Sequence, residues 1–165
     1  MNDRAPHIVV GVLPSQADDV LGQAVVFAER FGAVLACANV NPARRTASYT
    51  SDGTVISVPL VPRGLTTPPE LREEVAPEFT AEMQEILHGS SVEWTLHALA
   101  GDPARELELL ADRLDAAMII VGTRGPGARE MLRELFNGSV ADRLIFRQHR
   151  PVVVVPLRTQ KHESL

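Results

Sequence analysis

The sequence of 165 residues contains only one cysteine, Cys37. A single cysteine excludes an internal disulfide and suits a reducing compartment. Because it lies inside the apolar stretch "AVLACANV", we expect a buried strand position and not a reactive thiol. The N-terminal stretch has no signal-peptide pattern, and no apolar run approaches the length of a membrane span. These absences predict a cytoplasmic protein that does not interact with a membrane.

An excess of positive charge is also missing, since the net charge is −5. This excludes a protein that binds nucleic acid over its whole surface, and we expect no nucleic-acid partner. The charge is unevenly spread, because residues 124–158 contain seven arginines and three acidic residues, which gives +4 there and −9 elsewhere. Positive charge is therefore concentrated around the glycine-rich stretch "VGTRGPG", as an anion site requires. The alternative is that these arginines lie on solvated helix faces.

Several signatures of catalysis and nucleotide binding are absent as well. No Gly-Lys-Ser/Thr of a Walker P-loop occurs, and "GTRGPG" is not the Rossmann fingerprint, because Glu130 stands where its last glycine should be. Leu13 and Ala100-Gly101 occupy positions at which a response regulator needs acidic residues. The five histidines have no ligand or triad spacing. We therefore predict no catalytic residues and no metal site, and we expect the protein to bind a ligand without transforming it.

Continuous apolar runs alternate with stretches of helical spacing. The apolar runs are typical of strands buried on both faces, and the helical stretches carry a cap at Asp18, a stop at Gly32 and the start signal Asp102-Pro103. The expected strands are 7–13, 33–40, 91–100, 116–122 and 151–156, and the expected helices are 18–31, 70–87 with a division at Pro77, 102–115 and 139–148. This order predicts an α/β fold with an open, mostly parallel five-stranded sheet, Rossmann-like, with helices on both faces.

Residues 41–69 differ in character from the rest of the chain. They hold five of the twelve prolines, and "SYTSDGTVISV" within them predicts a hairpin that turns at Asp52-Gly53. We expect an inserted surface hairpin or loop at about 41–69 within a single domain of residues 1–158. The last residues, 159–165, are predicted to be a disordered tail.

The stretch "VGTRGPGAREMLRELFNGSV", residues 121–140, brackets a short helical pattern with glycines. Glycines let a backbone approach a ligand closely, and a Gly-Ser at a helix start offers free N–H groups and a hydroxyl. Ligands of open α/β sheets bind beyond the carboxyl ends of the strands, which is where this stretch and Leu13-Pro14-Ser15 lie. The pattern predicts an anion cradle. The alternative is that Gly-Ser is an ordinary helix cap and that the glycines only turn the chain.

Three segments, taken in order and spacing, resemble the universal stress protein family: "HIVVGVLPS", "GDPARELELLADRLDAAMIIVGTRG" and "GSVADRL…HRPVVVVP". The resemblance covers nearly the whole chain apart from residues 41–69. It implies an adenine nucleotide alpha hydrolase-like fold and a cytoplasmic location. It also implies ATP binding without robust hydrolysis in one branch of the family. A homodimer is implied through the last strand, which here is Pro151-Val152-Val153-Val154-Val155-Pro156.

The ATP-binding branch is marked by Gly-x2-Gly-x9-Gly-Ser/Thr, whereas this chain has Gly122-x2-Gly125-x12-Gly138-Ser139. Three extra residues add about 300° of helix and about 4.5 Å, so nearly the same face stays inward. The resemblance implies phosphate binding by the glycines and by the first amides of the last helix, with Arg124 facing the nucleotide and the Val40 backbone meeting adenine. The implied nucleotide-binding residues are Val12, Leu13, Val40, Val121, Gly122, Arg124, Gly125, Gly138, Ser139 and Val140.

The chain departs from that branch at Leu13, where ATP-binding members carry an aspartate that contacts the base or ribose. One polar anchor is therefore lost. Two functions stay open. The first is a stress-response or regulatory protein that binds ATP or another adenine nucleotide, with or without Mg²⁺, and is not an enzyme. The alternative is a dimeric interaction protein that binds no nucleotide and whose insert recognises a protein partner.

Overall fold

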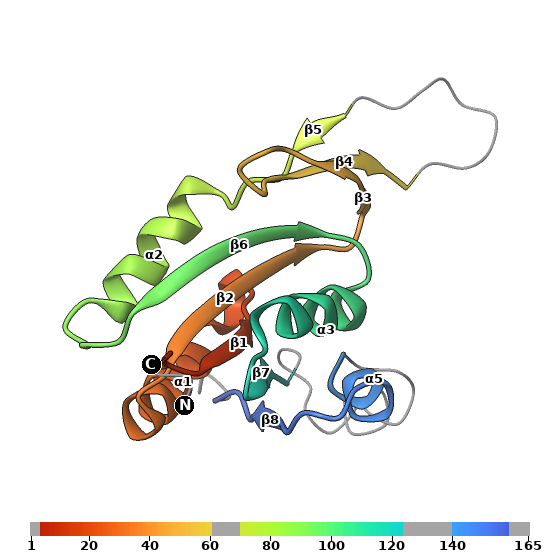
Figure 1. Ribbon diagram of the computed structural model, residues 1–165. Helices are drawn as coiled ribbons and strands as arrows, with labels where there is room; N and C mark the ends of the chain where they lie inside the picture. The colour runs from red at the N-terminus through yellow and green to blue at the C-terminus, as the bar shows by residue number, and fades with distance from the viewer. Residues whose placement is uncertain (1–3, 61–69, 124–139, 159–165) are drawn as a thin grey trace, which may run out of the picture.

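The computed structural model describes residues 4–60, 70–123 and 140–158 (Figure 1). Its strands are β1 (His7–Gly11), β2 (Val34–Asn41), β3 (Arg44–Tyr49), β4 (Val55–Pro59), β5 (Leu71–Arg72), β6 (Trp94–Ala100), β7 (Met118–Gly122) and β8 (Val152–Val155). Its helices are α1 (Ala17–Phe31), α2 (Pro77–Leu87), α3 (Pro103–Leu114) and α5 (Val140–Arg147), and a 3₁₀ turn, η1, covers Pro14–Gln16. The expected tail at 159–165 lies outside the described residues.

The central sheet has the order β6-β2-β1-β7-β8, and all its strands are parallel. The predicted five-stranded parallel sheet is therefore confirmed. From β1 the chain builds outward through β2 to β6, then returns to build β7 and β8 on the other side of β1. The strand order reverses between β1 and β7, so the topological switch point lies between these two strands.

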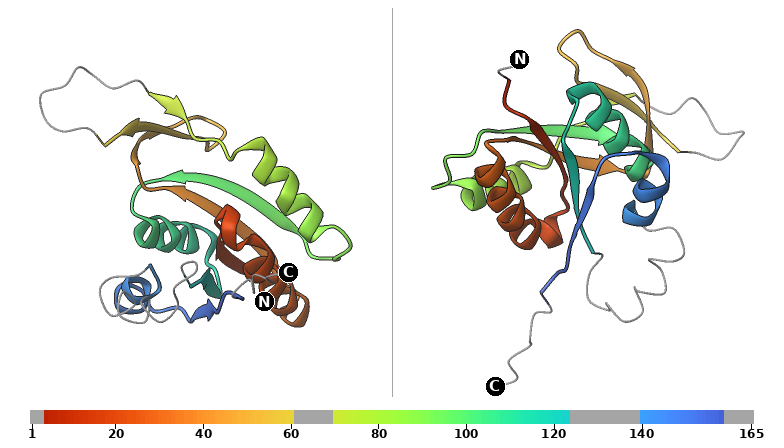
Figure 2. Two further views of the ribbon diagram at one scale, coloured as in Figure 1. Left: turned by 180° about the vertical axis from the view of Figure 1, so that it is seen from behind. Right: turned by 60° about the horizontal axis from the view of Figure 1, so that its bottom comes forward.

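Helices cover both faces of this sheet, and the two faces form separate cores. Figure 2 shows α1 and α2 on one side of the strands and α3 and α5 on the other. The first core cluster, on the α1 and α2 side, includes Ile8, Val10, Leu21, Leu35, Cys37 and Met83. The second core cluster, on the α3 and α5 side, includes Val9, Ala36, Leu107, Ile119 and Leu144. Successive residues of β1 enter opposite cores because side chains alternate along a strand.

Cys37 is fully buried in β2, as its apolar surroundings predicted. Burial raises the pKa of its thiol to about 12, which leaves the nucleophilic thiolate unpopulated near neutral pH. None of the described helices is long and apolar enough to cross a membrane.

The first and third helices test the predicted start and stop signals. Asp102 caps α3, because its Oδ1 accepts a hydrogen bond from the Arg105 amide at 3.0 Å, and Gly32 ends α1 with a φ of 59°. The predicted cap at Asp18 is wrong. Pro14 begins the 3₁₀ turn and leads the chain into α1 so that the N-cap is Gln16, two residues before Asp18, and Asp18 lies inside the first turn. Its negative charge still stabilises the helix N-terminus there.

The helix predicted over 70–87 begins only at Pro77, so the prediction for its first half is wrong. Leu71–Arg72 forms β5 instead. A proline disfavours the helical conformation of the residue before it, and Ala76 accordingly has φ −52° and ψ 134°. Pro77 therefore serves as the first helical residue and blocks extension toward the N-terminus.

The insert contains the predicted hairpin. Strands β3 and β4 are antiparallel, and the Gly53 amide donates to the Thr50 carbonyl at 3.0 Å in the turn between them. Strand β5 adds a third, unpredicted strand beside β4. Arg44, Ser57 and Glu73 form a buried polar cluster, in which Arg44 Nε lies 2.6 Å from Ser57 Oγ and 3.1 Å from Glu73 Oε1. This cluster ties the three strands of the insert together.

Candidate functional site

The segments that follow β1 and β7 meet at the switch point. Gln16 is only 6% exposed, and its side-chain amide donates to the Thr123 carbonyl at 2.9 Å. The Thr123 amide donates to the Val155 carbonyl at 3.0 Å, and the Thr123 hydroxyl accepts from the Leu157 amide at 3.1 Å. Thr123 is therefore held by η1 on one side and by the end of β8 on the other.

Gly122, the first glycine of the predicted cradle, also has a packing role. A Cβ added to it would lie 2.7 Å from Gln16 Oε1 and 2.8 Å from Val20 Cγ2. Real Cβ atoms do not approach other atoms this closely, so only glycine lets β7 pass this near to η1 and α1. Its contact with phosphate stays a prediction.

Three of the predicted nucleotide-binding residues come together on one face. Val40 at the end of β2, Val121 at the end of β7 and Val140 at the start of α5 all belong to, or pack against, the second core cluster. Val12 is buried in the first core cluster, on the opposite face. Leu13 follows β1 and is 41% exposed. Of the described residues predicted to bind nucleotide, Val40, Val121 and Val140 therefore contribute to the core on the α3 and α5 face, whereas Val12 contributes to the opposite one.

The other predicted residues lie outside the part of the chain that the structure describes. These are Arg124, Gly125, Gly138 and Ser139. The predicted phosphate contacts of these four residues thus remain a prediction, while the positions of Val40, Val121 and Val140 are observed.

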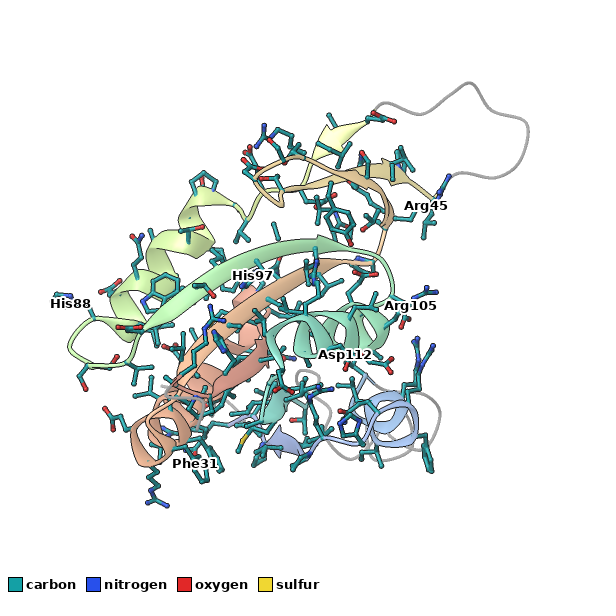
Figure 3. The ribbon with its side chains drawn as sticks, in the orientation of Figure 1. Phe31, Arg45, His88, His97, Arg105 and Asp112 are labelled. Atoms are coloured by element: carbon teal, nitrogen blue, oxygen red, sulfur yellow. The ribbon has the colours of Figure 1, made fainter. Side chains whose placement is uncertain are left out.

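The arginines behind the sequence-based charge argument have acidic partners wherever the structure describes them. Arg143 pairs with Asp102, Arg147 Nε lies 3.8 Å from Glu108 Oε2, and Arg150 Nη1 lies 2.6 Å from Asp112 Oδ1. These three pairs link α5 and the residues after it to α3, and Figure 3 shows Asp112 on the side of α3 that faces α5. Arg158 pairs with Asp19 on α1. Arg143 and Arg147 lie on α5 and are partly exposed, which fits the alternative of arginines on solvated helix faces, whereas Arg150 and Arg158 lie outside the helices.

The structure also identifies polar residues that the sequence analysis did not single out. Asn39 donates through its side-chain amide to the Val12 carbonyl at 3.0 Å, which ties the end of β2 to the end of β1. Gln16 is the second such residue. A polar residue within the apolar stretch "AVLACANV", and another directly after the first strand, are the signals that could have pointed to them.

Glu106 is the third such residue. It lies in the first turns of α3 and is only 8% exposed. A Cβ added to Gly101 would lie 2.9 Å from Glu106 Oε1, so the glutamate side chain occupies the space that this glycine leaves. Burial raises the pKa of the Glu106 carboxyl, against the opposing charges of Arg105 and Arg113 and with a contribution from Asp102. The burial of Glu106 was not predicted, because several acidic and basic residues alternate along the sequence of this helix.

Among the described residues, no group of three or more His, Cys, Asp or Glu side chains could hold a metal ion. His97 lies on β6 (Figure 3), where its Nε2 is 2.9 Å from Thr95 Oγ1. Burial lowers the pKa of His97, and the charges of Arg113 and His7 act in the same direction. The histidine thus lies against a neighbouring side chain of its own strand and away from the switch point.

The sheet order and the helices on both faces define a doubly wound α/β domain, a class in which ligands bind at the carboxyl ends of the strands. The profile of the Universal stress protein family matches residues 5–156, and the chain belongs to this family.

Sequence relatives agree with this assignment. The chain is 32% identical over 110 residues to the stress response protein NhaX of Bacillus subtilis, which covers 66% of this chain and 64% of NhaX. It is 33% identical over 86 residues to the universal stress protein MJ0531 of Methanocaldococcus jannaschii, with 52% and 49% covered. The chain therefore spans less than two thirds of the length of these relatives.

Two solved structures show the same fold. One is a universal stress protein in complex with cAMP, with a TM-score of 0.61, 18% identity, and coverage of 93% of this chain and 98% of that chain. The other is the universal stress protein from Archaeoglobus fulgidus in complex with dAMP, with a TM-score of 0.56, 20% identity, and coverage of 92% and 98%.

Proposed function

We propose that this protein binds an adenine nucleotide, ATP or AMP, at the carboxyl ends of β1, β2 and β7. In this proposal it is a cytoplasmic stress-response or regulatory binding protein without robust catalysis, formed by one domain of residues 1–158. The observation that carries the proposal is the topology, because the residues after β1, the end of β2 and the end of β7 lie at one edge of the sheet beside the switch point. Family membership and the cAMP and dAMP complexes of the structural relatives support it.

The proposed pose follows from the fold. The base lies against the backbone of Val40 and the side chain of Leu13, because the end of β2 and the residues that follow β1 are neighbours at this edge of the sheet. The phosphates lie beside Gly122, Arg124 and Gly125. They also meet the amides of Gly138, Ser139 and Val140, where the partial positive charge of a helix N-terminus stabilises an anion. Mg²⁺ would accompany the phosphates of ATP and needs no dedicated protein cluster.

The first test is to identify what the protein carries when it is purified. Heat denaturation should release AMP, ATP or a related adenine nucleotide, which mass spectrometry of the supernatant detects. Absence of any nucleotide, together with no binding of added AMP or ATP, would favour the alternative function. In that case Tyr49, Leu60 and Leu71, exposed apolar residues of the insert, are the first candidates for contact with a protein partner.

We also propose a homodimer through β8. This strand ends the sheet order, and an edge strand presents free backbone groups that a second copy can pair with. Phe146, on the helix that precedes β8, is 83% exposed, and its neighbour Ile145 is also exposed. Apolar side chains beside a sheet edge favour burial against a partner.

A further inference from the structure

The side chain of Leu13, after β1, offers no hydrogen-bond acceptor to a ligand. Leu13 is exposed and apolar, so it can pack against a base or ribose but cannot accept a hydrogen bond from either. A nucleotide that binds here still buries its exocyclic amine and its ribose hydroxyls, and buried donors need acceptors.

The first turns of α3 lie across the carboxyl ends of the neighbouring strands. Leu107 packs against Gly11 of β1, since a Cβ added to that glycine would lie 3.0 Å from Leu107 Cδ1. The preceding residue, Glu106, packs against Gly101, directly after β6. The Gly101 amide donates to the Asn41 carbonyl at 3.1 Å. The Glu106 carboxyl therefore lies near the end of β2, beside the backbone that the proposed pose assigns to the base.

The Glu106 carboxylate has no hydrogen bond or ion pair among the described residues, although the residue is 8% exposed. On the same helix or at its cap, Asp102, Glu108 and Asp112 each pair with an arginine. No fully buried side-chain oxygen of the described part of the chain is without a hydrogen-bond partner. A mostly buried acid with no hydrogen bond or ion pair among the described residues costs stability, and such groups occur at ligand sites.

We propose that Glu106 determines nucleotide specificity, by accepting a hydrogen bond from the exocyclic amine of the base in place of the acid that is missing at Leu13. This inference rests on the proposed function. A ribose hydroxyl could donate the same hydrogen bond to Glu106. Ligands that lack either the amine or the 2′-hydroxyl distinguish these two donors. Glu106 would act in ligand recognition and not in catalysis, because its carboxylate accepts a hydrogen bond and no covalent bond forms or breaks.

The test compares wild type with Glu106→Gln by calorimetric titration of AMP, IMP and 2′-deoxy-AMP. The variant should bind AMP about tenfold more weakly, because a charge-assisted hydrogen bond becomes a neutral one. IMP lacks the amine, so its affinity should change little, and the preference for AMP over IMP should shrink. If the preference for AMP over 2′-deoxy-AMP shrinks instead, the donor is the ribose hydroxyl and the assignment to the amine is wrong. Glu108→Gln removes the same charge from the same helix and should leave all three affinities unchanged.

A second measurement separates recognition from a structural role. Glu106→Gln should raise the thermal midpoint of the nucleotide-free protein at pH 7, because it removes a desolvated charge that has no partner. If Glu106 instead stabilised the fold, Glu106→Gln would lower this thermal midpoint. If wild type binds AMP and Glu106→Gln binds it equally well with the same preferences, the role of Glu106 is wrong and the proposed function stands. If wild type binds no nucleotide, both proposals fail.

Discussion

The side-chain amide of Gln16 donates to the Thr123 carbonyl at 2.9 Å, across the point where the strand order reverses. The two residues are 107 positions apart in the sequence. Thr123 directly follows Gly122 of the glycine-rich stretch, and it is also bonded to the end of β8 and the residues after it. Gln16 therefore fixes the point from which that stretch leaves the sheet.

Replacing Gln16 with alanine should destabilise the protein. The change leaves the Thr123 carbonyl without its side-chain donor, and an unsatisfied buried acceptor costs about 1–3 kcal/mol. Urea denaturation measures the loss in the free energy of unfolding. Gln23→Ala, at an exposed position of α1, is the matched control and should change this free energy by less than about 0.5 kcal/mol. Equal effects of the two substitutions would contradict the role given to Gln16.

Replacing Gly122 with alanine should also destabilise the protein, by about 1–3 kcal/mol, because the new Cβ overlaps Gln16 and Val20. Gly22→Ala should do the reverse. An added Cβ at Gly22 meets nothing within 4 Å, and alanine in a helix interior is more stable than glycine by about 0.5–1 kcal/mol. Chemical denaturation should show a lower free energy of unfolding for Gly122→Ala and a higher one for Gly22→Ala. A stabilising Gly122→Ala would show that Gly122 does not pack tightly against Gln16 and Val20.

The stability contribution of Asp102 should depend on pH. Burial alone would raise the pKa of Asp102, but the hydrogen bonds from Arg143 and the Arg105 amide, with the charges of Arg143 and Arg147, lower it overall. A lowered pKa means that the stabilisation is present above the ordinary aspartate range and is lost as the pH falls through the lowered pKa.

The substitution Asp102→Asn tests this dependence, since asparagine keeps the helix cap and removes the charge. It should reduce stability at pH 7 by no more than about 1 kcal/mol, because the pair with Arg143 is partly exposed. The difference from wild type should shrink as the pH falls below the ordinary aspartate range, through the lowered pKa of Asp102. For Glu106 the raised pKa reverses the sign, so the gain from Glu106→Gln appears as the pH rises above the ordinary glutamate range. Thermal melts from acid to neutral pH measure both trends, and a difference for Asp102→Asn that persists unchanged in acid would contradict the first.

Local signals made much of the fold predictable. Asp102-Pro103 before a periodic apolar face, Gly32 after one, and Asp52-Gly53 between two strand patterns each act over a few residues, and each lies where it was expected. The apolar runs placed the five strands of the central sheet for the same reason.

The errors arose where distant or competing signals decide the structure. Asp18 is a good cap in isolation, but the turn begun by Pro14 starts the helix earlier. Residues 70–76 have helical spacing, yet Leu71 and Arg72 form a strand that pairs with β4. The sequence of residues 70–76 alone contains no pattern that indicates this pairing. The bond between Gln16 and Thr123 and the burial of Glu106 against Gly101 depend on the assembled sheet, so no local pattern could have revealed them.

The proposed dimer makes a prediction about Phe146. Replacing this exposed side chain with glutamate should weaken self-association without damage to the fold, because a buried charge without a partner is unfavourable in an interface. Sedimentation velocity at micromolar concentration should show dimers for wild type and a shift toward monomers for Phe146→Glu. Phe31→Glu, at an exposed aromatic residue at the end of α1, should leave the dimer intact. A wild-type protein that sediments as a monomer would contradict the proposed dimer.

The central claim, adenine nucleotide binding at this edge of the sheet, is tested most directly by calorimetric titration of ATP into nucleotide-free wild type and Gly138→Asp. Aspartate at 138 places a carboxylate and a Cβ at the proposed phosphate position, so ATP affinity should fall at least about tenfold, or about 1.4 kcal/mol. Gly22→Asp adds the same side chain at an exposed position of α1 and should bind ATP like wild type. No binding of ATP or AMP by wild type, or equal binding by wild type and Gly138→Asp, would contradict the account.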